Sequence, residues 1–316
     1  MSSPESAARR VARVACAQVA ALFLAEGYLA EWATAGALLG VNYGVGGKRT
    51  PVTLRDTATR PVADPDLLHP YRPNSVSGAV LFVLCFAVPA ALVLAANAAS
   101  AAAHLPGGHL GAAAVAIGTR DVAHFMLSLF QAYALSSTWK VWLNVAVGRQ
   151  RPDWYARLAT GDAAVIAEGR LSYPSGHSAY THASAAVCAL YVAARLRVFA
   201  RDAPRAQMAR LLAAAAPLGV AGAVAASRLT DYRHHFSDVN AGALIGLLCG
   251  AACYNLNFSG QGRRIARCRP AQGPAAAWAA AQLAGAEDEA LPPKERSDAA
   301  AGANDDAQEL TAAAAL

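Results

Sequence analysis

The chain reads SRLTDYRHHFSD over residues 227–238, a short polar stretch between two long apolar runs. His234 and Asp238 lie four residues apart, so a helix that includes both would place them on one face. The carboxylate could then hold one imidazole nitrogen while the other faces outward, as in a histidine nucleophile or base. Arg228 adds a planar set of donors that suits a phosphate or a carboxylate. Taken alone, this stretch could instead be a polar loop that has no catalytic or binding role.

The apolar runs belong to a composition that is typical of membrane proteins. Of the 316 residues, 55% are hydrophobic and only 15% are charged, and the mean hydropathy is positive. Six blocks approach or reach the roughly 20 residues that a helix needs to cross a bilayer. They cover 16–40, 77–99, 122–147, 177–196, 207–226 and 239–258. The sequence therefore predicts an all-α, polytopic membrane protein with six transmembrane helices, and buried helices of a soluble protein are the alternative.

Clusters of arginine indicate how these helices are oriented. They lie at 9–13, before the first predicted helix, at 195–210, between the fourth and fifth, and at 263–269, after the sixth. Six crossings put all three clusters on one side, which the positive-inside rule makes cytoplasmic. We therefore expect both termini in the cytoplasm. The net charge of +6 is expected to face anionic lipid headgroups and not nucleic acid.

This topology divides the chain into three parts. Residues 1–15 form a cytoplasmic N-terminal tail, residues 16–260 a six-helix membrane domain, and residues 261–316 a cytoplasmic C-terminal tail. The C-terminal part is rich in alanine, glycine and charge, which predicts disorder. A long loop, 42–77, joins the first two predicted helices on the non-cytoplasmic side. A loop of this length either caps a site or is a flexible connector.

The end of the third predicted helix carries basic residues near the membrane boundary. Lys140 lies inside the apolar segment, where a charge is costly unless it serves a function or reaches the interface. Trp139 and Trp142 flank it and favour a position at the interface. Arg151 follows the segment, and Pro152 ends the helix. Arg151 is therefore expected on the same side as residues 227–238.

The start of the fourth predicted helix reads PSGH over residues 174–177. Proline, serine and glycine before a helix leave backbone amides free at its N-terminal end, which is a natural anion site. His177 could there give a proton to a leaving oxygen. A solvent-facing histidine behind a Ser/Gly cap is the alternative. Because this helix start also lies on the non-cytoplasmic side, the three polar segments can meet.

Together the segments supply the groups that would bind a phosphate. Arg151, Arg228 and the backbone amides at Ser175 and Gly176 would hold its oxygens. No carboxylate cluster is left over to bind a metal, so we expect no metal and no cofactor.

The same segments supply groups for the reaction. His234 would attack phosphorus in line, and Asp238 would support the charged imidazole. His177 would protonate the departing alkoxide and then, as a base, help water to cleave the phosphohistidine.

These residues resemble the three-part signature of the type 2 phosphatidic acid phosphatase superfamily, the lipid phosphate phosphatases. The signature has a lysine separated by six residues from Arg-Pro, then Pro-Ser-Gly-His, then Ser-Arg, five residues, His, three residues and Asp. Residues 174–177 match the second part, residues 227–238 match the third, and residues 151–152 match the end of the first. The resemblance covers about residues 65–260 and implies a six-helix, metal-independent phosphatase whose nucleophile is His234.

The first part of the signature departs from the family pattern. Asn144 occupies the position of the lysine, and Lys140 lies one helical turn earlier. A lysine stem can reach about one turn along a helix, so Lys140 could bring its charge to the same phosphate. We therefore predict an active enzyme in which Asn144→Lys does not abolish activity.

The sequence thus predicts a membrane-embedded lipid phosphate phosphatase with its site on the luminal or extracellular side. Phosphatidate, which would yield diacylglycerol, is the leading substrate; sphingoid phosphates, lysophosphatidate and diacylglycerol pyrophosphate are the others. A lipid phosphotransferase that uses an acceptor alcohol and a catalytically weak membrane scaffold are alternative functions. The soluble vanadate-dependent haloperoxidases share the motifs, but six hydrophobic segments argue against that activity.

Overall fold

The structure, a computed structural model, describes residues 4–25, 27–47, 64–103, 112–199, 206–259 and 267–268. The chain forms two compact units. Of the described residues, the first unit contains 4–25, 27–28, 97–103 and 112–120, and the second contains 29–47, 64–96, 121–199, 206–259 and 267–268. The predicted C-terminal tail, 261–316, lies outside the described residues except for Arg267–Cys268.

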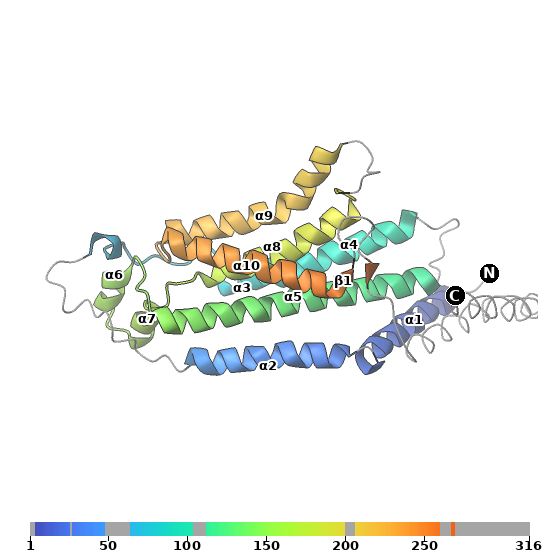
Figure 1. Cartoon of the computed structure of the whole chain (residues 1–316), viewed down its shortest axis with the longest axis horizontal. Helices are drawn as coiled ribbons and strands as arrows, with labels where there is room; N and C mark the ends of the chain where they lie inside the picture. Colours follow the sequence, from blue (N-terminus) through green and yellow to red (C-terminus); the bar gives the residue numbers. More distant parts are fainter. Residues whose placement is uncertain are drawn as a thin grey trace, which may run out of the picture. The chain divides into compact units, whose positions relative to one another are not determined.

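Apart from two short strands, the regular secondary structure of the described residues is helical, which confirms the predicted all-α class. The strands pair antiparallel, with Phe258 opposite Cys268. The elements in chain order are α1 (Pro4–Ala25), α2 (Tyr28–Gly47), the 3-10 helix η3 (Pro65–Leu67), α3 (Gly78–Phe82), the π-helix η4 (Val83–Ala87), α4 (Val88–Ala103), α5 (Ala112–Val147), α6 (Trp154–Ala159), α7 (Ala163–Glu168), α8 (Gly176–Arg195), α9 (Gln207–Thr230), α10 (Phe236–Asn257), β1 (Phe258–Ser259) and β2 (Arg267–Cys268) (Figure 1).

Each of the six predicted blocks is helical, but the first is not one helix. Block 16–40 is interrupted at Gly27, whose φ of 74° is a left-handed conformation that favours glycine. Helix α1 begins already at Pro4, so most of the predicted tail 1–15 is helical. Block 77–99 is continuous through α3, η4 and α4, and Ser77 caps its start by accepting a hydrogen bond from Val80 N.

Six membrane spans are not confirmed. Among the described residues, three helices are long and apolar enough to cross a membrane: Gly78–Ala99, Gln207–Thr230 and Phe236–Asn257. The interrupted pair α1 and α2 would make a fourth. Helix α8 does not qualify because its first turns are polar, and twelve of its residues are buried inside the protein. A helix that contacts protein instead of lipid does not need an apolar surface, and composition alone does not separate the two cases.

Helix α8 packs against α9 and α10 and runs beside both in Figure 1. Glycine makes the approach of α10 possible. A Cβ atom at Gly242, Gly246 or Gly250 would collide with a backbone carbonyl oxygen of Ser175, Ala179 or Ala183. The four-residue spacing places these glycines on one face of α10, which allows the two helices to approach closely. The contact aligns the N-terminal ends of α8 and α10, because Ser175 N donates to the backbone oxygen of Asp238 at 3.0 Å.

The apolar core of the second unit is formed by side chains of α4, α5, α8 and α10. Its buried side chains include Val93, Phe125, Leu129, Val187, Tyr191 and Tyr254. Helix α2 packs on α5, where Trp32 stacks on Phe130 and Asn42 Nδ2 donates to Thr138 Oγ1 at 3.0 Å. The core therefore holds α5, α8 and α10 in place, and the loops at their ends form the polar region.

Candidate active site

Three loop segments of the second unit meet around the N-terminal ends of α8 and α10. They are residues 148–175, between α5 and α8, residues 231–235, between α9 and α10, and residues 64–77, before α3. The predicted polar segments are therefore brought together. Of the predicted loop 42–77, residues up to Gly47 belong to α2, and residues 48–63 lie outside the described residues. The remaining part, residues 64–77, lies beside the other two segments, which favours a cap over a flexible connector.

His234 lies in the loop that joins α9 to α10 and is 6% exposed. Its Nδ1 is 2.7 Å from the backbone carbonyl oxygen of Ser172. A carbonyl oxygen can only accept a hydrogen bond, so Nδ1 carries the proton of the neutral ring and donates it. The other nitrogen, Nε2, therefore holds the lone pair, which is the form that a histidine nucleophile needs.

The predicted support of His234 by Asp238 needs a correction. Asp238 Oδ2 lies 3.9 Å from His234 Nδ1, which is beyond hydrogen-bond distance. The prediction assumed that one helix includes both residues, but α10 begins only at Phe236. His234 lies in the preceding loop, where the four-residue spacing of a helix does not apply. Asp238 contributes a negative charge near His234 and no orienting hydrogen bond.

Asp238 instead ties the neighbouring segments together through a fully buried carboxylate. Its Oδ1 accepts from Arg149 Nη1 at 2.6 Å, and its Oδ2 accepts from Ser172 Oγ at 2.6 Å. Oδ2 also accepts from His235 N at 2.9 Å, which closes a capping box at the start of α10. The sequence alone assigns no role to Arg149, Ser172 or His235. Each lies within two residues of a motif position, which is the one local signal that could point to them.

Burial lowers the pKa of His234 well below its ordinary value, and the nearby Arg151 guanidinium lowers this pKa further. The charge of Asp238 and the carbonyl of Ser172 act in the opposite direction but do not overcome burial. Because its pKa is lowered, the imidazole is neutral at neutral pH. A neutral, buried imidazole among cations suits attack on an electrophile that carries negative charge, such as a phosphate ester.

Arg228 lies in the last turn of α9 and is 1% exposed, with its guanidinium held on three sides. Nη2 donates to Asp231 Oδ2 at 2.9 Å, and Nε and Nη2 donate to Ser227 Oγ at 3.1 and 2.9 Å. Nη1 donates to Asn74 Oδ1 at 3.2 Å. The predicted phosphate-binding arginine is therefore rigid and contacts the segment before α3.

Arg151 lies in the loop between α5 and α8, which is held together by ion pairs. Its Nη1 donates to Glu168 Oε1 at 3.0 Å, and its buried Nε has no partner among the described residues. The buried Arg157 bonds Asp153 at 2.7 Å and Glu168 at 3.2 Å. Burial alone would raise the pKa of Glu168, but Arg151 and Arg157 lower it below its ordinary value. Glu168 is therefore ionised, and it competes with any phosphate for Arg151.

His177 lies in the first turn of α8, with its Nε2 3.1 Å from the backbone oxygen of Val76. It interacts electrostatically with both His234 and Arg228, so the predicted catalytic groups do lie together. The Ser175 amide, however, donates to the Asp238 backbone oxygen, and this corrects its predicted role in phosphate binding. The amides of Gly176, His177 and Ser178, in the first turn, have no acceptor within the helix and are the donors that could bind an anion.

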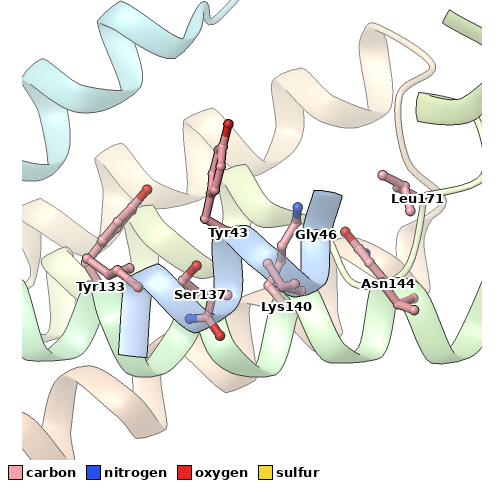
Figure 2. Close-up of a pocket in the computed structure, with 11 residues that line it drawn as sticks. Tyr43, Gly46, Tyr133, Ser137, Lys140, Asn144 and Leu171 are labelled. Carbon is pink, nitrogen blue, oxygen red and sulfur yellow. The ribbon is translucent and has the colours of Figure 1, made fainter. Parts of the chain in front are cut away.

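Lys140 and Asn144 lie one turn apart on α5 and line a cavity of about 520 Å³ next to α2 (Figure 2). Asn144 Nδ2 donates to the backbone oxygens of Tyr173 and Pro174 at 2.7 and 3.2 Å. It therefore fixes the turn before α8. The Lys140 side chain reaches that turn, because its Cε would lie 3.1 Å from a Cβ atom at Gly176. Lys140 is thus in a position to supply the charge that Asn144 lacks.

The site combines a neutral histidine, a second histidine and several cations. Among the described residues, no group of three or more His, Cys, Asp or Glu side chains is placed to hold a metal ion. This arrangement is chemically able to bind an anionic group, attack it and protonate what leaves.

Part of the chain is similar to known proteins. Residues 122–260 match the model of the PAP2 superfamily. A PA-phosphatase related-family protein of Dictyostelium discoideum is 40% identical over 141 residues, which cover 45% of this chain and 51% of that protein. Lipid phosphate phosphatase 2 of Arabidopsis thaliana is 35% identical over 150 residues, 42% of this chain and 51% of the relative.

A third relative is the probable diacylglycerol pyrophosphate phosphatase 1 of Schizosaccharomyces pombe, 29% identical over 134 residues, 37% of this chain and 47% of the relative. The chain spans about half the length of each of these proteins. No solved structure matches it. The matched region contains His177, Arg228, His234 and Asp238. Residues 122–260 of this chain, which carry these side chains, are therefore similar to the PAP2 superfamily.

Proposed function

We propose that this protein is a membrane-bound, metal-independent lipid phosphate phosphatase that works through a phosphohistidine. The observation that carries the proposal is the bond from His234 Nδ1 to the Ser172 carbonyl oxygen at 2.7 Å. It holds the ring in the tautomer whose Nε2 can attack phosphorus. The lowered pKa of His234 keeps this nitrogen unprotonated at neutral pH.

The reaction proceeds in two displacements. In the first, Nε2 of His234 forms a bond to phosphorus while the bond from phosphorus to the lipid oxygen breaks, and His177 gives that oxygen its proton. In the second, His177 takes a proton from water, the water oxygen attacks phosphorus, and the bond to nitrogen breaks. Arg228, Arg151 and Lys140 stabilise the negative charge of the phosphoryl group throughout.

Phosphatidate is the substrate that we propose, with diacylglycerol and inorganic phosphate as products. The apolar helices support a substrate that stays in the membrane, and two of the similar proteins are named as lipid phosphate and diacylglycerol pyrophosphate phosphatases. A site at the ends of the helices meets headgroups without extracting the lipid.

The test is phosphate release by the full chain in detergent micelles, with a chelator, from phosphatidate, lysophosphatidate, a sphingoid phosphate and diacylglycerol pyrophosphate. Wild type is compared with His234→Ala and with His182→Ala as a matched histidine on α8. We expect His234→Ala to lose at least ~10³-fold in turnover and His182→Ala to stay close to wild type. Release that survives in His234→Ala excludes the nucleophile, and loss of wild-type activity in chelator excludes metal independence.

We also propose that this site lies on the luminal or extracellular side, with both termini in the cytoplasm. Residues 257–259 read Asn-Phe-Ser, which is an N-glycosylation acceptor sequence. Asn257 is a poor reporter of orientation, because its amide is buried and bonds Ser128 and Gln131. The exposed Leu158 is a better position, since Leu158→Asn completes an acceptor sequence with Thr160. Glycan on this variant, expressed in eukaryotic cells, is the expected result; an unmodified variant that retains activity would reverse the orientation.

A further inference from the structure

The segment before α3, residues 69–77, crosses the site and is here called the strap. Its outer contacts reach both neighbouring loops. His69 N donates to Pro152 O at 3.1 Å, and the His69 ring stacks on Tyr232 at 4.3 Å between centroids. Arg72 also lies over the Tyr232 ring, 4.8 Å from its centroid. These contacts fix the course of the strap without any help from its inner side chains.

The inner side of the strap contacts the site through three consecutive residues. Asn74 Oδ1 accepts from Arg228 Nη1 at 3.2 Å. Ser75 donates to Asp231 through both its N and its Oγ, at 2.8 and 2.5 Å.

Val76 completes the inner side, because its backbone oxygen is 3.1 Å from His177 Nε2. The strap therefore touches a phosphate-binding arginine, the carboxylate that pairs with it, and the proposed general acid.

The bonds of Arg228 leave a defined place for a ligand. A guanidinium has five N–H groups, and the contacts with Ser227, Asp231 and Asn74 use four of them. The fifth belongs to Nη1, the nitrogen that Asn74 holds. Ser227 and Asp231 hold Nε and Nη2 of the planar guanidinium, and Asn74 holds the nitrogen that carries this free N–H.

The bond of His177 has a similar consequence. The Val76 carbonyl can only accept, so His177 donates to it from Nε2 and must use Nδ1 for a second proton. Nδ1 is then the nitrogen that gives its proton to a leaving oxygen. His234 is oriented in the same way by the carbonyl of Ser172. A backbone carbonyl thus orients each of the two histidines.

We propose that the strap completes the active site: Asn74 is a positioning residue that aims Arg228 at the phosphate, and the Val76 carbonyl orients His177 toward the leaving oxygen. This inference rests on the proposed function, because it assigns the two groups to phosphate binding and to protonation.

Binding of inorganic phosphate tests the role of Asn74 without any turnover. The full chain in micelles is titrated calorimetrically as wild type, Asn74→Ala, Asn74→Asp and Asn255→Ala, a matched change at an exposed asparagine that bonds only within α10. We expect Asn74→Ala to raise the Kd of phosphate about 10-fold, the scale of one charge-assisted contact. Asn74→Asp is expected to raise the Kd more, because its carboxylate neutralises Arg228. Asn255→Ala is expected to leave the Kd unchanged.

If the Kd of phosphate is unchanged in both Asn74→Ala and Asn74→Asp, the strap only supports the fold. This conclusion holds whether or not the midpoint of thermal unfolding is lowered. The result is separate from that of the proposed function, because phosphate binding is measured even if no lipid phosphate is hydrolysed. Inactivity toward every lipid phosphate in wild type would overturn the proposed function, whereas the Kd values decide the role of Asn74.

The role of the Val76 carbonyl is tested by comparing turnover of two substrates whose leaving groups differ in their need for a proton. Ser75→Ala removes the Oγ bond to Asp231 and loosens the next residue of the strap. If Val76 orients the acid, turnover falls several-fold for an alkyl phosphate, whose leaving oxygen needs a proton. Turnover of 4-nitrophenyl phosphate, whose leaving group departs without one, should be unchanged. An equal fall for both substrates would contradict the orienting role.

Discussion

The two ends of α8 both carry buried charges, but they balance them differently. At the last turn, one carboxylate meets one arginine: Asp121 Oδ2 lies 2.5 Å from Arg195 Nη2 and 2.5 Å from the Tyr191 hydroxyl. At the first turn, four carboxylates face six cations. The carboxylates are Asp153, Glu168, Asp231 and Asp238, and the cations are Lys140, Arg149, Arg151, Arg157, Arg228 and Arg233.

This difference separates a structural cluster from a binding site. An ion pair of one carboxylate with one arginine mainly holds helices together. A surplus of positive charge at a site that is largely buried is costly by itself, and an anionic ligand offsets that cost. Variants at the first turn are therefore expected to change activity, and variants at the last turn are expected to change stability alone.

The largest effect should come from His177→Ala. Loss of the general acid is expected to lower turnover of an alkyl phosphate by ~10²–10⁴-fold. Turnover of 4-nitrophenyl phosphate should fall by less than about 10-fold, because that leaving group needs no proton. Both rates are measured on the same preparation. Equal losses for the two substrates would remove His177 from the role of acid.

The next effect concerns Asn144, where the structure sharpens the expectation from the sequence. Asn144→Ala leaves the carbonyls of Tyr173 and Pro174 without their donor, which should destabilise the turn before α8 by ~1–3 kcal/mol and lower activity. Asn144→Lys keeps a donor at this position and should retain activity within a few-fold of wild type. Activity and thermal midpoint are compared for the two variants. A lysine variant as poor as the alanine variant would show that only the amide fits.

A smaller effect is expected in the dependence on pH. His234 reacts as the neutral ring, so activity falls as pH drops through its lowered pKa, and the acid limb should lie below that of an ordinary histidine. Arg151→Gln removes a cation that lowers this pKa. The pKa then rises, protonation occurs at higher pH, and the acid limb moves upward. Profiles of kcat/KM for wild type and variant measure the shift; a downward or absent shift contradicts this electrostatic coupling.

The smallest effect on activity is expected at the other end of α8. Tyr191→Phe removes the hydroxyl that bonds Asp121 and Arg195, which should cost ~1–2 kcal/mol of unfolding free energy. Phosphate release should equal that of wild type once the folded fraction is matched. A change in KM would mean that the two ends of α8 are coupled and that the contrast between them does not hold.

The sequence by itself determined the helical blocks, the all-α class and the residues that carry the chemistry. These are local properties: an apolar block predicts a helix through its own composition, and the motif spacings place His177, Arg228, His234 and Asp238 near helix ends. The sequence by itself did not determine how many of these helices cross the membrane. A helix such as α8 is polar where it contacts protein, and only its neighbours distinguish that surface from one that contacts lipid.

Only the tertiary structure decided which groups hold the reacting residues. Ser172 is 62 residues away from His234 along the chain, and Asn74 is 154 residues away from Arg228. Such pairs depend on loop conformations that no local pattern records. The start of α10 at Phe236 matters most, because it moves His234 out of the helix and away from Asp238. Backbone carbonyls orient both histidines. Because every residue type has a backbone carbonyl, the sequence could not indicate which ones orient the histidines.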